Sequence, residues 1–218
     1  MLPIICIVGA SNSGKTTFLE QLIPELRGRG YRVGTVKHDV HGFEIDREGK
    51  DTWRHRKAGA QTVAIASPQM LAAIRQTAAE MPLEQIAGRC FWDEDILITE
   101  GYKQSHFPKI EVFRSAIEAK PICTPKDNLL AIVTDDPVEL DVPRFRFEEV
   151  SHVADLIEER FLKGRKRSRI TVVVDGKKIP MNDFVQDFMV GGTVGMLSSL
   201  RGWKPPRKID IQIRLEDE

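Results

Sequence analysis

The stretch that decides the fold is Gly9-Ala10-Ser11-Asn12-Ser13-Gly14-Lys15-Thr16, close to the start of the chain. Its spacing is GxxxxGK[ST], the pattern of a loop that wraps around the phosphates of a nucleotide. The apolar run from Pro3 to Val8 before it predicts a buried strand. The segment from Thr16 to Arg27 after it has apolar residues at helical spacing. A strand, this loop and a helix predict a nucleoside triphosphate site.

The residue types of this loop each suit contact with phosphate. Glycines let backbone N–H groups converge on phosphate oxygens, and the start of the helix adds its positive end. Lys15 can reach the β- and γ-phosphates, and the Thr16 hydroxyl can bind Mg²⁺. The nucleotide contacts that we expect in this segment come from Gly9, Ser11, Asn12, Ser13, Gly14, Lys15, Thr16 and Thr17.

A second pattern is Asp95-Ile-Leu-Ile-Thr-Glu100-Gly101, an apolar strand that ends in a carboxylate. Ligands of open α/β sheets gather at the carboxyl ends of the strands, so Glu100 is expected beside the phosphates. It is predicted to bind Mg²⁺ through water or to orient the attacking water. Lys15 and Glu100 are therefore the two catalytic candidates.

A third, charged segment runs from Lys37 to Ala60, after the predicted strand from Tyr31 to Val36. Loops at this position can enter phosphate sites. It is dense in groups that can meet phosphates or Mg²⁺, and its part from Asp51 to Ala58 has helical character. The charged candidates are Lys37, Asp46, Asp51, Arg54 and Arg56.

Strands and helices alternate along the first 162 residues, which predicts an α/β layer fold with a mostly parallel P-loop NTPase sheet flanked by helices. Further strands are expected at Thr62–Ala66, Leu71–Arg75, Ile96–Thr99, Lys109–Phe113, Leu129–Thr134 and Val142–Phe147. Further helices are expected at Pro82–Arg89 and Val150–Leu162.

The C-terminal part differs in character. Residues 163–169 hold five basic residues in seven and are expected to be an exposed linker. Residues 170–218 predict a small α+β module: a strand at Ile170–Val174, two short helices interrupted at Gly191-Gly192, and a strand at Ile209–Leu215. The module is too short to be expected to act as an enzyme by itself.

Composition narrows the class of protein. The 218 residues include 32 basic and 32 acidic ones, so the formal net charge is zero, which disfavours a nucleic-acid binder. No apolar run approaches the roughly 18 residues of a membrane span. Three isolated cysteines argue against a disulfide framework. We expect a cytoplasmic protein with no membrane partner.

The three patterns together resemble the MobB family, the accessory proteins of molybdopterin-guanine dinucleotide biosynthesis, within the SIMIBI group of P-loop NTPases. The resemblance covers about residues 1–160 and depends on D-x-x-G-K-D-[ST]-x-R-x-R-x-A-G-A and E-G-[YF]-K. It implies GTP binding with Mg²⁺, slow hydrolysis and a homodimer. It also implies a partner nucleotidyltransferase of the MobA family, which joins GMP to molybdopterin.

The resemblance also assigns residues. It carries Lys15, Thr16 and Glu100 over directly, makes Asp46 or Asp51 a Mg²⁺ contact, and places Arg54, Arg56 and Gly101 near the nucleotide or a shared cleft. Two departures stand out. The chain has no clear N-K-x-D motif for guanine, and Asp135 at a strand end is the better-placed reader of guanine N1 and N2. Residues 170–218 lie outside the resemblance, so pterin binding, partner docking, dimer contact and a structural cap stay open for them.

Other functions share the same P-loop. A metallochaperone GTPase would show a richer set of His and Cys ligands than the five His and three Cys of this chain. A small-molecule kinase would need an arginine-bearing lid, which Arg54 and Arg56 could mimic. A non-catalytic protein with a structural nucleotide is the fourth reading. For the GTPase we expect in-line attack of water on the γ-phosphate, slow because no arginine finger is evident.

Overall fold

The structure is a computed structural model that describes residues 2–39, 42–164, 170–174 and 177–204, and the single residues 206, 209, 211 and 213. The chain divides into two compact units, Met1–Arg165 and Lys166–Glu218.

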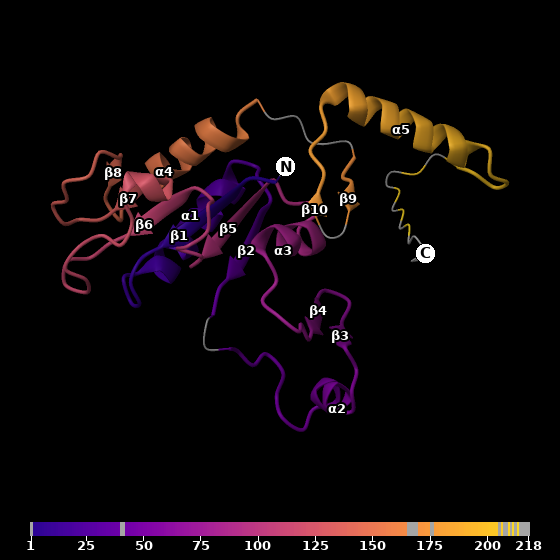
Figure 1. Cartoon of the computed structure of the whole chain (residues 1–218), viewed down its shortest axis with the longest axis horizontal. Helices are drawn as coiled ribbons and strands as arrows, with labels where there is room; N and C mark the ends of the chain where they lie inside the picture. The colour runs from indigo at the N-terminus through magenta and orange to yellow at the C-terminus, as the bar shows by residue number, and fades with distance from the viewer. Residues whose placement is uncertain are drawn as a thin grey trace. The chain divides into compact units, whose positions relative to one another are not determined.

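The first unit is built on a six-stranded sheet in the order β2-β5-β1-β6-β7-β8 (Figure 1). Every pairing in it is parallel. The predicted α/β class with a mostly parallel sheet is therefore confirmed. The strands are β1 (Ile4–Val8), β2 (Val33–Lys37), β5 (Ile96–Glu100), β6 (Lys109–Val112), β7 (Leu129–Val133) and β8 (Arg144–Phe145).

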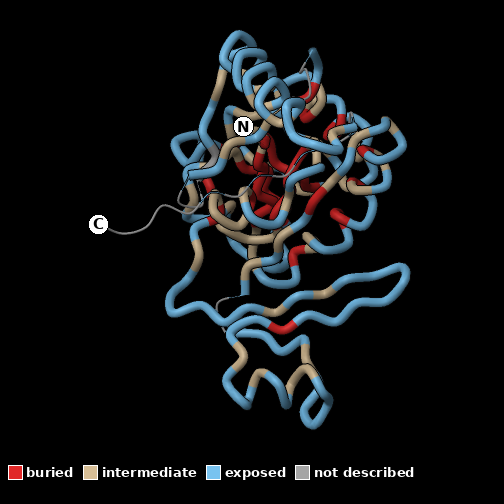
Figure 2. The backbone as a smooth tube through the Cα atoms, turned by 90° about the vertical axis from the view of Figure 1, so that its right-hand side faces the viewer, coloured by how far each residue is buried: buried red, intermediate tan, exposed pale blue. Residues whose placement is uncertain are grey.

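The central strand β1 is buried along its whole length because both faces of the sheet are covered. Figure 2 shows that most of the buried residues gather in one region of the chain. Ile5 and Ile7 belong to a core with α1 (Lys15–Gly28) and α4 (Val150–Ile157). Ile4, Cys6 and Val8 belong to a second core with α3 (Leu83–Cys90). Successive side chains of a strand point to opposite faces, so a continuous apolar run is what a strand covered on both sides requires.

Two predicted strands lie outside the main sheet. β3 (Thr62–Ala66) and β4 (Leu71–Arg75) form a separate antiparallel hairpin, which packs against α2 (Asp51–Lys57) (Figure 1). Val63 is buried in this small subassembly. The sequence pattern predicted the strands and their bounds, but hydrophobic alternation does not say which partner a strand pairs with.

Two buried charged residues of β6, Lys109 and Glu111, hold neighbouring loops through hydrogen bonds to their backbone. Lys109 is 1% exposed, and its Nζ donates to the backbone oxygens of Phe107 at 3.0 Å, Asp127 at 2.8 Å and Ser105. Glu111, also 1% exposed, accepts the backbone N–H groups of residues 122 and 123. Burial raises the pKa of the Glu111 carboxyl, and these two hydrogen bonds lower it.

The second unit contains an antiparallel pair, β9 (Val173–Val174) and β10 (Lys177–Lys178), and one long helix, α5 (Asp183–Ser198). The predicted interruption at Gly191-Gly192 is wrong, because α5 continues through both glycines. A glycine costs a helix about 1 kcal/mol but keeps its N–H group, so it does not end a helix by itself. The Asn182 side chain caps the helix by accepting from Val185 N.

Parts of the sequence predictions fall outside the described residues. These are residues 165–169 of the basic linker and most of the strand expected at Ile209–Leu215. Among the residues that are described, no helix is long and apolar enough to cross a membrane.

The buried Lys109 gives a stability prediction. Lys109→Met keeps the length of the side chain but leaves three backbone carbonyls without their donor, so we expect the free energy of unfolding to fall by about 3 kcal/mol. The midpoint of urea unfolding measures this. Lys126→Ala, at an exposed position, is the control and should change stability by less than about 0.5 kcal/mol. Equal midpoints for the wild type and Lys109→Met would contradict the prediction.

Candidate functional site

The backbone of the P-loop depends on two glycines. Gly9 has φ +144°, and a Cβ there would lie 2.2 Å from the carbonyl oxygen of Val112 on the neighbouring β6. Gly14 has φ +99° immediately before α1. Both conformations are open to glycine and strained for other residues. The turn therefore lies directly against the sheet and places the N-terminus of α1 at the end of β1.

Lys15 lies across the loop that precedes it. Its Nζ donates to the backbone oxygens of Gly9 at 3.1 Å and Ala10 at 2.6 Å. Burial lowers the pKa of Lys15, the Glu100 carboxylate raises it, and the nearby Lys37 lowers it. The backbone oxygens of Gly9 and Ala10 thus hold the Lys15 ammonium group beside the loop, where it could also contact a bound phosphate.

One hydrogen bond joins the P-loop to the acid at the end of β5. Thr16 Oγ1 donates to Glu100 Oε2 at 2.9 Å. Lys37 Nζ lies 3.8 Å from Glu100 Oε1, since Lys37 and Glu100 are paired at the ends of β2 and β5. A hydroxyl and a carboxylate beside a phosphate loop are oxygen donors that Mg²⁺ accepts, so this donor set fits the expected ion.

The remaining P-loop residues have distinct places. Ser11 and Asn12 are exposed at the tip of the loop, and Thr17 is exposed on the first turn of α1. Ser13 is buried, and its hydroxyl has no hydrogen-bond partner among the described residues. Gly101 follows β5 with φ +99°, and a Cβ there would meet the His38 side chain at 3.1 Å.

The two acids after β7 differ in availability. Asp136 Oδ2 accepts Ser115 N at 2.7 Å, so this carboxylate holds a loop together, and its pKa is lowered by that bond. Asp135 is exposed, and among the described residues its Oδ1 accepts only a long 3.4 Å contact from Phe147 N. Asp135 is therefore the more exposed and less engaged of the two acids.

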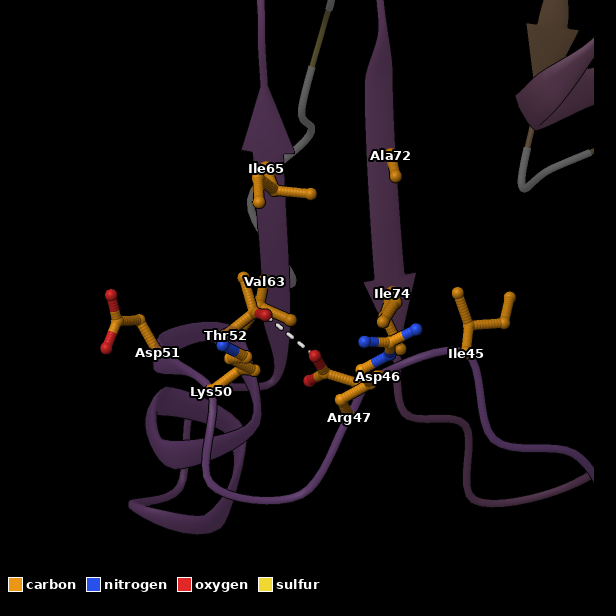
Figure 3. A pocket seen from close by; sticks show the side chains of 10 residues that line it. All are labelled: Ile45, Asp46, Arg47, Lys50, Asp51, Thr52, Val63, Ile65, Ala72 and Ile74. Atoms are coloured by element: carbon orange, nitrogen blue, oxygen red, sulfur yellow. Dashed lines mark hydrogen bonds between the residues drawn. The ribbon is translucent and has the colours of Figure 1, made fainter.

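The third pattern builds a pocket of its own (Figure 3). Asp46 accepts a hydrogen bond from Thr52 at 2.7 Å and lies 3.8 Å from Arg56 Nε. A cavity of about 410 Å³ lies between this segment and the apolar face of the hairpin. Its lining is Ile45, Asp46, Arg47, Lys50, Asp51, Thr52, Val63, Ile65, Ala72 and Ile74.

None of the hydrogen bonds or ion pairs of the described residues joins Asp46, Asp51, Arg54 or Arg56 to the P-loop. Their contacts lie within α2, the segment before it and the hairpin. The geometry thus groups Lys15, Thr16 and Glu100 at one place, and the four residues of the third pattern at another.

One residue beside the P-loop was missed by the sequence reasoning. Arg114 follows β6, donates from Nε to Ser13 O at 3.2 Å and lies 3.9 Å from the centre of the Phe147 ring. No motif marks Arg114, and it is 101 positions from Ser13 in the chain. Its position directly after the strand predicted at Lys109–Phe113 could have indicated it, because ligands bind at the carboxyl ends of parallel strands.

Comparison with known proteins identifies the family. The profile described as "Molybdopterin guanine dinucleotide synthesis protein B" matches residues 4–135. The chain is 37% identical to a molybdopterin-guanine dinucleotide biosynthesis adapter protein of Haemophilus influenzae, over 72% of this chain and 88% of that protein. It is 35% identical to the Escherichia coli protein of the same name, over 73% and 93%. A crystal structure of molybdopterin-guanine biosynthesis protein B superposes with a TM-score of 0.58 at 34% identity, covering 72% of this chain and 98% of the other. The chain therefore belongs to the MobB family of molybdopterin guanine dinucleotide synthesis proteins.

Proposed function

We propose that this protein binds GTP and Mg²⁺ at its P-loop and acts as an adapter in the synthesis of molybdopterin guanine dinucleotide. The partner in this proposal is a MobA-type nucleotidyltransferase that transfers GMP to molybdopterin. The observation that carries the nucleotide site is the 2.9 Å hydrogen bond from Thr16 to Glu100, which joins the phosphate loop to the carboxylate at the end of β5. Family membership supports the pathway.

The proposed chemistry is slow hydrolysis. Mg²⁺ would withdraw charge from the β- and γ-phosphates and fix their orientation. Thr16 and Glu100 would hold it, Lys15 would balance charge on the γ-phosphate, and Glu100 would orient a water for in-line attack. Arg114 is bonded to Ser13 on the β6 side of the loop, away from the Glu100 carboxylate on the β5 side. Among the described residues, no arginine bonds to Lys15, Thr16 or Glu100, so turnover far below 10 s⁻¹ is expected.

Calorimetric titration with GTP and ATP, each with and without Mg²⁺, tests the proposal. We expect Mg²⁺ to tighten GTP binding and ATP to bind much more weakly. Glu100→Gln keeps an acceptor for Thr16 but removes the charge that attracts the ion. The factor by which Mg²⁺ tightens GTP binding, the Mg²⁺ enhancement, should therefore fall about tenfold or more.

Glu118→Gln, an exposed acid at a loop beyond β6, is the matched control and should leave the enhancement unchanged. A preference for ATP would overturn the GTP assignment and favour a small-molecule kinase. Equal Mg²⁺ enhancement in the wild type and Glu100→Gln would remove Glu100 from the metal site.

Asp135 is the proposed reader of the guanine edge. A carboxylate accepts two hydrogen bonds from N1–H and the 2-amino group of guanine, whereas an asparagine amide can donate to the 2-oxo group of xanthine. We expect Asp135→Asn to weaken GTP binding and strengthen XTP binding, changing their ratio about tenfold or more. Competition titration of the two nucleotides measures the ratio.

Asp136→Asn is the control, because Asp136 is engaged by the Ser115 backbone. It should lower stability without changing the choice of base. If Asp135→Asn leaves the GTP/XTP ratio unchanged, the base is read elsewhere.

A homodimer is the third part of the proposal. An isolated two-stranded hairpin is only marginally stable in water. The β3–β4 hairpin also exposes large apolar side chains, with Leu71 71% and Ile65 62% exposed. A second copy of the chain would cover them, in line with the dimers that the family resemblance implies.

We expect Leu71→Glu to convert a dimer to monomers, because a charge would be buried at the contact. Sedimentation velocity at several protein concentrations measures this. Ile117→Glu, an exposed apolar residue outside the hairpin, should leave the sedimentation unchanged. A monomeric wild type, or a dimer that survives Leu71→Glu, would contradict the prediction.

A further inference from the structure

Two sides of the P-loop are chemically different. On one side β1 pairs with β5, and β5 pairs with β2; the ends of these strands carry Glu100 and Lys37. On the other side β1 pairs with β6, followed by β7 and β8. The second side holds no metal-binding carboxylate next to Thr16 among the described contacts. It presents a cationic and aromatic surface instead.

This surface is the pair formed by Arg114 and Phe147. The Arg114 guanidinium lies 3.9 Å from the centre of the Phe147 ring. Both abut the loop: the Cβ position of Gly14 would be 3.5 Å from Phe147 Cε1 and 3.6 Å from Arg114 Nε. Phe147 is partly buried against the core, whereas Arg114 is exposed, so the outer face of the stack belongs to the guanidinium.

The guanidinium is held in place from two directions. Its Nε donates to Ser13 O at 3.2 Å, and the ring of Phe147 supports its plane. Among the described residues, its two terminal nitrogens have no hydrogen-bond acceptor. The backbone N–H of Phe147 also reaches Asp135 Oδ1 at 3.4 Å, which brings the available carboxylate beside the stack.

With the phosphates of the proposed nucleotide on Lys15 and Thr16, Glu100 and Lys37 occupy the β5 side of the loop. The β6 side is then the one left for the ribose and base. That side is the one with Arg114, Phe147 and Asp135. Planar arginine side chains stack on bases, and such stacking accepts any base, because every base has a π-face. A carboxylate at the edge of the stack would then select guanine.

We infer that the Arg114–Phe147 pair is the wall of the nucleobase site: the base stacks on Arg114, and Phe147 is a positioning residue that holds Arg114 flat. The inference rests on the proposed nucleotide site and adds its base-binding half. Because Arg114 also bonds to the Ser13 carbonyl, the same side chain would contact both the base and the phosphate loop.

The test compares GTP with inorganic tripolyphosphate, which carries the phosphates but no base, both titrated with Mg²⁺. Arg114→Lys keeps the positive charge and loses the planar face. It should weaken GTP binding about tenfold and leave tripolyphosphate binding within about twofold. Phe147→Leu keeps an apolar side chain against the core and should weaken GTP binding in the same selective way.

Two matched variants serve as controls. Arg144→Lys changes an exposed arginine on β8, and Phe145→Leu changes a partly buried phenylalanine of the same core cluster. Both should leave the ratio of GTP to tripolyphosphate affinity unchanged, and thermal unfolding shows whether each variant is folded.

The outcomes separate the two proposals. Selective loss of GTP affinity in Arg114→Lys supports the base wall. Equal losses for both ligands, or no loss for either, overturn it while the phosphate site stands. A wild type that binds GTP no better than tripolyphosphate also overturns it. A wild type that binds neither ligand overturns the proposed nucleotide site itself.

Discussion

The parallel pairing of β1 with β5 on one side and β6 on the other is the constraint on which the site depends. β1 is buried on both faces, so its register with these neighbours is held by two cores at once. The register sets the end of β5 beside the start of α1, which puts Glu100 within hydrogen-bond distance of Thr16. It also puts the end of β6 against Gly9, where only a glycine leaves room for the Val112 carbonyl.

The charges at this sheet edge constrain one another. Glu100 faces the Thr16 hydroxyl on one side and the Lys37 ammonium on the other. Lys15 is pulled toward the neutral form by burial and toward the charged form by Glu100. The negative charge of Glu100 therefore partly offsets the positive charges of Lys15 and Lys37. Added phosphate and Mg²⁺ would enter a site whose opposite charges are already arranged.

Two elements that are not part of the six-stranded sheet leave large apolar side chains exposed. The hairpin of β3 and β4 and the helix α5 both present large apolar side chains, with Leu71 and Phe188 each 71% exposed. Such surfaces are typical of contact with another chain.

Local pattern was enough for much of this protein. The P-loop, the buried strands and the acid at the end of Ile96–Glu100 follow from short-range spacing, and the rule that parallel strands share one edge predicts that Glu100 lies near Thr16 across 84 positions. Spacing failed at Gly191-Gly192, where it predicted a break in a continuous helix.

Tertiary structure alone decided the rest. It separated β3–β4 from the main sheet and packed Asp46 and Arg56 beside the hairpin, because strand pairing is a choice among partners that alternation does not encode. It also brought Arg114 and Phe147 to the P-loop. The sequence by itself determined the residue types and spacing of the P-loop and of the strand-end acid, since a motif consists of residues close together in the chain. Which groups meet was decided by sheet register and packing, since those contacts join residues that are distant in the chain.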